Sequence, residues 1–218
     1  MRVILATHNK DKANELSQIL NLLLNGCRLT ADGCRLTAVG WEVLIINDLC
    51  PDLKIVEDGT TYAENAQKKA RAVFTALRAK SLIDEQSIVL GEDSGLEVDA
   101  LGGKPGVMSA RFGGDEATAY ERNRQLLEMM IAVPEELRTA RFRCVICLIH
   151  STGSEKIFSG MCEGKIAHTI RGTSGFGYDP IFIPDGYTQT FAELGQTVKN
   201  KISHRARAMQ QVIEYFIR

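Results

Sequence analysis

The sequence has almost no net charge and no long apolar run. Its 218 residues include 26 lysines and arginines against 27 aspartates and glutamates, which gives a formal net charge of −1. No broad positive field is therefore available for a nucleic acid polymer or an anionic membrane. No stretch approaches the ~18 apolar residues of a membrane span, and the apolar run in the opening MRVILATHNK is too short for a secretory signal. We expect a soluble, cytoplasmic protein that binds neither nucleic acid nor membrane.

The chain also lacks the signatures of several common sites. Of its six cysteines only Cys144 and Cys147 form a C-x-x-C, and no second such pair exists to complete a zinc site. That pair lies in a strand-like run, where residues three apart point to opposite faces, so buried free thiols are expected. The segments 102–105 and 164–166 resemble a P-loop only in part, because they lack its spacing, and no Rossmann glycine fingerprint is present.

Strand-like and helix-like segments alternate along the chain, which predicts an α/β fold. The helix expected from Thr61 has a start signal, because Glu64 follows three residues later as in a capping box. The length and the 44% hydrophobic fraction suit one globular domain over residues 1–218. The expected strands are 2–6, 43–46, 87–90, 140–149, 156–162 and 181–183, and the expected helices are 10–24, 61–80, 117–131 and 203–217.

Residues 26–38 contain a tandem duplication. The sequence GlyCysArgLeuThrAla occurs at 26–31 and again at 33–38, with Asp32 between the copies. A single duplication is no solenoid array, because such arrays need several repeats to bury a core. We expect residues 21–40 to form a surface insertion after the first helix.

Polar and basic residues gather where the first helix begins. Thr7, Asn9, Lys10 and Lys12 surround its N-terminus, where backbone N–H groups and the helix dipole favour an anion. The lysines oppose the dipole, so they lower local stability unless a phosphate offsets their charge. An ordinary capped surface helix explains this segment equally well on its own.

Carboxylates follow the expected strand 87–90. Residues 91–96 read GlyGluAspSerGlyLeu, and adjacent carboxylates at a strand end suit a divalent cation or a general base. The glycine-rich continuation at 101–106 favours a functional interpretation over an acidic turn. Lys69 lies on the apolar stripe of the helix expected at 61–80, where a lysine can also reach into a site. Glu64 is explained as a cap, whereas Glu57 has no such structural role.

Two segments in the last third of the chain are candidates for binding a flat ligand. In 174–180, SerGlyPheGlyTyrAspPro, the glycines leave room beside the Phe176 ring. A glycine turn with core aromatics is the alternative. In 199–205, LysAsnLysIleSerHisArg, the expected N-cap Ser203 places His204 and Arg205 in the first helical turn, where the dipole disfavours cations. That placement indicates an anionic or hydrogen-bonding partner.

In this order, the segments resemble the inosine triphosphate pyrophosphatase family, the xanthosine/inosine triphosphate diphosphatases. The resemblance runs from Val3 to near the C-terminus, and several independent motifs occur in register. The family commonly has Asp-Asp-Ser-Gly where this chain has Glu92 before Asp93, and it lacks the duplicated segment. The matching motifs are Thr7-x-Asn9-x-x-Lys12; Glu57 with Glu64-Asn65-Ala66-x-x-Lys69-Ala70; Asp93–Leu96; Gly102–Gly106; Phe176–Pro180; and Ser203–Arg205.

The resemblance implies a mixed-sheet α/β fold of two lobes with the active-site cleft between them, a homodimer, and Mg²⁺ as cofactor. The implied reaction is hydrolysis of ITP, dITP and XTP to the nucleoside monophosphate and pyrophosphate. Asp93 would be the general base and would hold Mg²⁺ together with Glu57. The implied triphosphate-binding residues are Thr7, His8, Asn9, Lys10, Asp11, Lys12 and Lys69, with Ser94 as a further substrate contact. The implied base pocket consists of Phe176, Gly177, Tyr178, Asp179, Lys199, His204 and Arg205.

Two other functions remain open at this point. One is a nucleotide-binding regulator without turnover, which the presence of Asp93, Glu57 and Lys69 disfavours. The other is a pyrophosphatase that acts on modified pyrimidine nucleotides. A panel of triphosphates distinguishes these alternatives.

Overall fold

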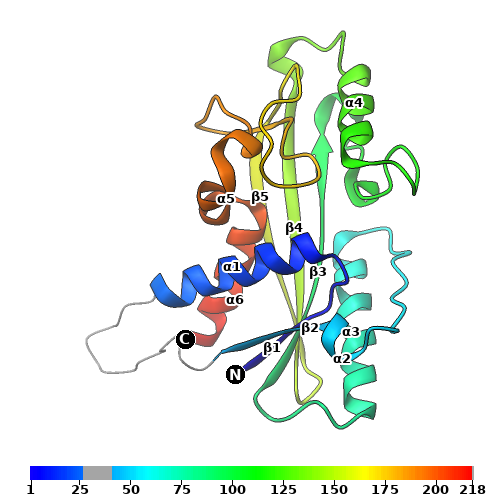
Figure 1. The fold of residues 1–218 in the computed structure, drawn as a ribbon, viewed down its shortest axis with the longest axis vertical. Helices are drawn as coiled ribbons and strands as arrows, with labels where there is room; N and C mark the ends of the chain where they lie inside the picture. Colours follow the sequence, from blue (N-terminus) through cyan, green and yellow to red (C-terminus); the bar gives the residue numbers. More distant parts are fainter. Residues whose placement is uncertain (27–40, 218) are drawn as a thin grey trace. The chain divides into compact units, whose positions relative to one another are not determined.

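The computed structural model describes residues 1–26 and 41–217 (Figure 1). In these residues, helices and strands are mixed along the chain as an α/β fold requires, and three 3-10 turns lie among them. In the described residues no helix has the length and apolar character that crossing a membrane requires. The elements are β1 (Arg2–Leu5), α1 (Lys10–Gly26), β2 (Glu42–Ile45), α2 (Ile46–Leu49), α3 (Tyr62–Ala79), β3 (Ser87–Val98), α4 (Ala119–Met129), β4 (Thr139–His150), β5 (Glu155–Ile166), β6 (Phe182–Pro184), α5 (Phe191–Ile202) and α6 (His204–Ile217).

The strands form one mixed six-stranded sheet in the order β2-β1-β3-β4-β5-β6 (Figure 1). β1 is parallel to both β2 and β3, and β5 is antiparallel to β6. The hairpin predicted across 151–154 is present, because the His150 N–H donates to the Ser154 carbonyl at 3.0 Å. The predicted α/β class is confirmed.

The chain divides into two compact units. Unit 1 comprises residues 1–93, 145–159 and 208–218, and unit 2 comprises residues 94–144 and 160–207. In unit 1 the buried Ile4 and Val89 pack against the apolar face of α3, including Ala70. Val3 and Leu5 are also buried and point to the opposite face of the same strand. In unit 2 the core gathers residues of α4, α5 and the strands around Phe142 and Phe182.

The strand predicted at 87–90 ends too early in the chain. β3 continues to Val98, so Glu92, Asp93 and Ser94 lie within a strand and not in a loop after it. Leu96 and Val98 are fully buried in the unit 2 core, which explains why the strand continues. Gly91 does not interrupt the strand. A side chain there would overlap the Ala66 carbonyl, so the glycine allows α3 to pass close to β3.

Three other differences concern the helices. Helix α5 was not expected, and its Gly195 has a non-helical φ of 76°. The short helix α2 begins at Ile46, where the sequence predicted the end of a strand. Residues 21–26 continue α1, while residues 27–40, which hold most of the duplication and of the expected insertion, lie outside the described residues.

Candidate active site

The parallel pairing of β1 and β3 brings two of the predicted segments together. Leu5 is in register with Leu90, and the Ala6 N–H donates to the Leu90 carbonyl at 2.8 Å. The carboxyl ends of parallel strands meet at one edge of a sheet. The segment Thr7–Lys12 therefore begins beside Glu92 and Asp93, although about eighty positions separate them in the sequence.

The start of α1 is capped by its own side chains. The Asn9 Oδ1 accepts from the Lys12 N–H at 3.0 Å, and the Thr7 Oγ1 accepts from the Asn9 N–H at 3.2 Å. These bonds satisfy part of the helix N-terminus and fix the turn. Thr7 is buried, whereas Lys10 and Asp11 are exposed. The predicted helix start is confirmed, and both lysines extend from a rigid turn.

His8 is held by the protein on both ring nitrogens. Its Nδ1 is hydrogen-bonded to the Asn47 side chain, and its Nε2 lies 2.8 Å from the Leu53 carbonyl oxygen. The imidazole therefore links the start of α1 to the segment around α2. The His8 ring therefore stabilises the position of the α1 start relative to the α2 segment within unit 1.

Asp93 is the centre of a buried charged cluster in unit 1. The Lys69 Nζ donates to Asp93 Oδ1 at 3.0 Å and lies 2.5 Å from Glu57 Oε2. The Lys69 ammonium also donates to the Glu92 carbonyl at 3.0 Å. Only 5% of Asp93 and 4% of Lys69 are exposed. Because Lys69 lies on the buried face of α3, that helix sets the position of the cluster.

A second ion pair lies beside the first. The Lys12 Nζ is 3.0 Å from Glu92 Oε2, and Glu92 is 2% exposed. The longer side chain of Glu92, where the resembling family commonly has Asp, reaches the lysine at the start of α1. Glu92 was absent from the predicted site residues. Its position next to Asp93 in an apolar strand was the available signal.

The electrostatics of the cluster favour a basic carboxylate next to a charged lysine. Burial raises the pKa of Asp93 above its ordinary value, against the opposing effect of Lys69 and Lys12. Burial also disfavours the ammonium form of Lys69, but the charges of Asp93, Glu92 and Glu57 outweigh it and raise its pKa. A carboxylate with a raised pKa is a better proton acceptor than a surface aspartate.

Glu57 and Asp93 fit a hard divalent cation by the chemistry of their donor groups. Both carboxylates contact the same ammonium group of Lys69, so they lie close enough to bind one cation together. Within residues 1–26 and 41–217, no group of three or more His, Cys, Asp and Glu side chains is placed to hold a metal ion. Mg²⁺ commonly uses one or two carboxylates and completes its shell with water and substrate phosphates.

The predicted Glu64 cap is confirmed, because its side chain and that of Thr61 form the capping box of α3.

In unit 2, the predicted segment 174–180 is built around Asp179. Its Oδ2 accepts from the Phe176 N–H at 2.9 Å and from the Lys199 Nζ at 2.7 Å. Both Asp179 and Lys199 are 1% exposed. Gly175 has a φ of 78°, and a side chain there would overlap the Asp179 carboxylate. The glycine is therefore required for the close approach of the chain to this buried ion pair.

Two cations lie over the Phe176 ring. The Lys199 Nζ is 4.5 Å and the Arg205 guanidinium carbon 5.2 Å from the ring centroid, within the range of cation–π attraction. Arg205 also donates from Nη2 to the Ser94 Oγ at 2.7 Å. Four of the predicted residues thus form one group in unit 2, namely Ser94, Phe176, Lys199 and Arg205.

His204 and Tyr178 are packed into the interior of unit 2. The His204 ring is stacked on Phe142 with a centroid separation of 4.7 Å and an angle of 10°. The Tyr178 hydroxyl donates to the Ser109 carbonyl at 2.8 Å, and burial raises the pKa of this phenol. The predicted cap Ser203 is confirmed, because its Oγ accepts from the Ala206 N–H.

Two buried asparagines contact predicted site residues and were missed. The Asn65 Nδ2 donates to Asp93 Oδ2 at 3.2 Å, while its Oδ1 accepts from the Gly59 N–H at 2.8 Å. The Asn123 Nδ2 donates to the Gly177 carbonyl at 2.9 Å. Each asparagine lies on the buried face of an amphipathic helix. A polar residue on an apolar stripe was the signal that could have identified them.

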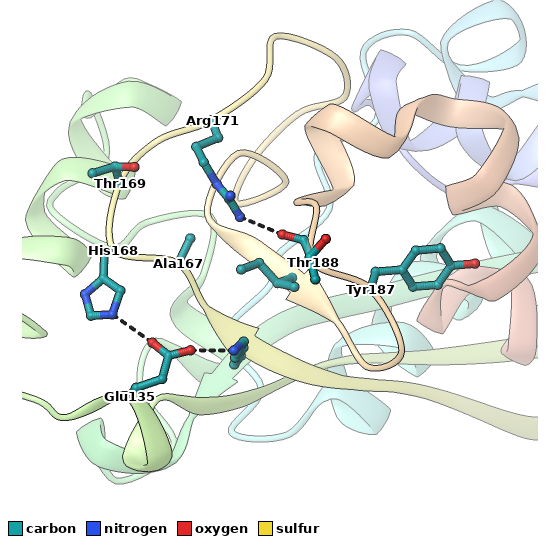
Figure 2. Close-up of a pocket in the computed structure, with 9 residues that line it drawn as sticks. Glu135, Ala167, His168, Thr169, Arg171, Tyr187 and Thr188 are labelled. Atoms are coloured by element: carbon teal, nitrogen blue, oxygen red, sulfur yellow. Dashed lines mark hydrogen bonds and ion pairs between the residues drawn. The ribbon is translucent and has the colours of Figure 1, made fainter.

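A cavity of about 280 Å³ in unit 2 contains none of the predicted site residues in its lining (Figure 2). Its charged groups pair with one another. Glu135 accepts from the Lys165 ammonium and from the His168 Nε2 at 2.7 Å, and Arg171 donates to the Thr188 carbonyl at 3.1 Å (Figure 2). We assign no function to this cavity, because Glu135, Lys165 and His168 pair with one another and none of the predicted site residues lines it.

Comparison with known proteins identifies the family of this chain. A family model described as the Ham1 family matches residues 3–215. The chain belongs to the Ham1 family. A curated Ham1 relative, the dITP/XTP pyrophosphatase of Desulforamulus reducens, is 42% identical over 216 residues, which cover 98% of this chain and 94% of the relative. The dITP/XTP pyrophosphatase of Caldanaerobacter subterraneus is 39% identical over 220 residues, which cover 100% of this chain and 97% of the relative.

Solved Ham1 structures have the same fold. The HAM1 protein from Coxiella burnetii matches with a TM-score of 0.77 and 32% identity, covering 100% of this chain and 98% of that one. The Ham1 protein of Staphylococcus aureus matches with a TM-score of 0.77 and 31% identity, covering 99% and 98%. The family predicted from the sequence motifs is confirmed.

Proposed function

We propose that this chain hydrolyses the triphosphates of hypoxanthine and xanthine nucleosides to the monophosphate and pyrophosphate. The observation that carries the proposal is the buried Asp93, held between Lys69 and Asn65 and accompanied by Glu57. The named activity of the Ham1 relatives supports the same reaction. The reaction removes non-standard purine nucleotides from the nucleotide pool.

In this proposal, the start of α1 holds the triphosphate. Its backbone N–H groups and the lysines there attract phosphate oxygens, and Lys69 adds a further positive charge. A phosphate would also offset the unfavourable placement of cations at a helix N-terminus. The proposed phosphate-binding residues are Thr7, His8, Asn9, Lys10, Asp11, Lys12 and Lys69.

Asp93 acts on the attacking water in this proposal. Its buried carboxylate accepts a proton from water, and the water oxygen attacks the α-phosphorus while pyrophosphate leaves. Glu57 and Asp93 would hold Mg²⁺, which when bound offsets negative charge on the phosphates. Lys69 supplies positive charge next to both carboxylates, and the Lys12–Glu92 pair fixes a second ammonium nearby.

The residues around Phe176 recognise the base in this proposal. Phe176 offers a stacking face, and Ser94 adds a substrate contact. The cations of Lys199 and Arg205 are donors suited to a 6-oxo group. Adenine carries an amine at that position, so the donors would face another donor and lose their partner. The remaining base-pocket residues are Gly177, Tyr178, Asp179 and His204.

The assembly and location belong to the same proposal. We expect a homodimer in the cytoplasm, where nucleoside triphosphates are found. Sedimentation equilibrium of the purified protein tests the assembly, since a dimer has twice the 24.1 kDa mass of the chain. A constant single-chain mass over a wide concentration range would contradict it.

A panel of triphosphates tests the reaction. The protein is incubated with dITP, XTP, dATP, dGTP and modified pyrimidine triphosphates, with and without Mg²⁺, and pyrophosphate is measured in the absence of contaminating inorganic pyrophosphatase. We expect Mg²⁺-dependent pyrophosphate from dITP and XTP. Binding without turnover would indicate a regulator, and preference for the pyrimidines would indicate the other enzyme class.

A further inference from the structure

Asn123 is a buried polar residue of α4 with one engaged and one unpaired group. It is 2% exposed, and its Nδ2 donates to the Gly177 carbonyl at 2.9 Å. Its Oδ1 is buried and has no hydrogen-bond partner among the described residues. An unpaired buried acceptor lowers stability, and an apolar side chain of the same shape would avoid that loss. The contact with Gly177 is therefore what the asparagine provides at this position.

Gly177 lies in a tight turn whose central peptide joins it to Tyr178. The Asp179 N–H donates to the Phe176 carbonyl at 3.2 Å, which closes the turn over residues 176–179. Gly177 has a positive φ of 62°, whereas the φ of Tyr178 is not positive. This combination is the pattern of a type II′ turn. Type I′ and type II′ turns differ in the direction of the peptide that joins the two central residues.

The bond from Asn123 fixes that direction. It holds the Gly177 carbonyl toward α4, and in a planar trans peptide the N–H of the next residue points to the opposite side. The Tyr178 N–H is therefore directed away from α4. Tyr178 is itself held by the bond from its hydroxyl to the Ser109 carbonyl. A side chain added at Gly177 would meet no described atom within 4 Å, so there is open space beside this peptide.

The turn also carries the residues assigned above to the base. Phe176 is its first residue, with Lys199 and Arg205 over its ring, and Asp179 is its last. We propose that Asn123 is a positioning residue for purine recognition, because it holds the 177–178 peptide so that the Tyr178 N–H donates to the 6-oxo group of the base. This inference rests on the proposed function, and it adds a backbone donor to the specificity of that site.

Two variants separate hydrogen bonding from packing. Asn123→Leu keeps the branched shape of the side chain but cannot donate, and Asn123→Ala removes both the shape and the donor. The matched control is Leu126→Ala, which removes volume from the buried face of the same helix and leaves the contact with Gly177 in place. Circular dichroism and thermal unfolding establish which variants are folded before the kinetics are measured.

Steady-state kinetics on dITP and dATP give the first readout. We expect both Asn123 variants to raise KM for dITP about three- to tenfold with little change in kcat, as for loss of one neutral hydrogen bond. The ratio of kcat/KM for dITP to that for dATP should fall by the same factor. The control should lower the melting temperature and leave the ratio unchanged. An unchanged ratio in a folded Asn123 variant overturns the inference.

Backbone NMR gives a readout that does not depend on turnover. With ¹⁵N-labelled tyrosine, the five tyrosine amides are observed, and Tyr178→Phe identifies the signal of Tyr178. We expect dIMP to shift this signal strongly in the wild type and weakly in Asn123→Leu. Equal shifts in both proteins contradict the inference, even if the proposed function is correct. A wild-type protein that releases no pyrophosphate from dITP would instead contradict the proposed function.

Discussion

The cluster around Asp93 and the turn at 176–179 use opposite kinds of contact. Around Asp93, charged side chains meet one another, and the three carboxylates of Glu57, Glu92 and Asp93 face the two ammonium groups of Lys12 and Lys69. Around the turn, Lys199 and Arg205 lie over an aromatic ring, and one carboxylate, Asp179, pairs with Lys199. The first group has an excess of negative charge and the second an excess of positive charge.

This difference assigns separate tasks to the two groups. An excess of carboxylates suits a divalent cation and a proton acceptor, which every triphosphate substrate needs equally. Donors over a ring suit a flat base with an oxygen acceptor, which only some substrates have. Substitutions near Asp93 should therefore affect all substrates alike, and substitutions near Phe176 should affect the choice between them.

The largest effect is expected from Asp93→Asn. It removes the proton acceptor and a proposed metal ligand, so kcat should fall by about 10²–10⁴-fold on dITP and dATP alike. Pyrophosphate release measures the loss, and thermal unfolding checks the fold. Asp84→Asn is the control, because Asp84 is an exposed carboxylate paired with Arg2 in the same unit. Near-normal turnover in Asp93→Asn would remove Asp93 from the chemistry.

Lys69→Met should destabilise the protein more than any other single change near Asp93. The ammonium group faces Asp93 and Glu57, and removing one partner of a buried pair costs about 3–5 kcal/mol. Denaturant unfolding measures the change in the free energy of unfolding. The control is Lys68→Met, whose ammonium pairs with the exposed Asp58. Equal effects of the two substitutions would show that the buried cluster does not depend on Lys69.

The sequence predicted some contacts between neighbouring residues, whereas the capping boxes Thr118–Glu121 and Thr190–Glu193 were missed. The Thr61–Glu64 capping box and the Ser203 cap could be identified because the partners are three residues apart. The helix α5 was missed, because Gly195 interrupts its geometry and Lys199 and Asn200 occupy buried positions. The segments proposed to carry the site were predicted from their motifs.

The contacts inside the site could not be predicted in the same way. Lys12 and Glu92 are 80 residues apart, and only the register of β1 with β3 brings them together. Asn123 reaches Gly177 over a separation of 54 residues. A local signal can mark Glu92 or Asn123 as unusual, but it does not identify the partner, so the sheet and helix packing had to be known first.

Arg205→Ala tests the other side of the comparison. Its donors face Ser94 and the Phe176 ring, so its loss should reduce kcat/KM for ITP far more than for ATP. The gap between the substrates should narrow by roughly 1–3 kcal/mol. Arg207→Ala on the same helix is the control, because Arg207 donates to the Met161 carbonyl at an exposed position. Equal losses of kcat/KM on both nucleotides would show that Arg205 contacts the phosphates or only stabilises the fold.

The smallest effect is expected from the thiols, which belong to neither group. Cys50, Cys144, Cys147 and Cys162 are buried, and burial raises the pKa of Cys147 to about 12 and of Cys162 to about 11. Burial shields all four thiols from a disulfide reagent, and the raised pKa of Cys147 and Cys162 leaves little thiolate near pH 8, so none of the four should react in the folded protein. The rate of thiol labelling is measured on a Cys27→Ser/Cys34→Ser variant, so that only these four thiols can react. The same variant in denaturant is the positive control. Rapid native labelling of one thiol would show that its unit opens locally.

The most direct test of the central claim follows the oxygen of the attacking water. Hydrolysis of dITP is carried out in H₂¹⁸O with Mg²⁺, and the products are separated and analysed by mass spectrometry. Attack at the α-phosphorus predicts one ¹⁸O atom in dIMP and none in pyrophosphate. Label in the pyrophosphate, or release of orthophosphate with dIDP, would contradict the account.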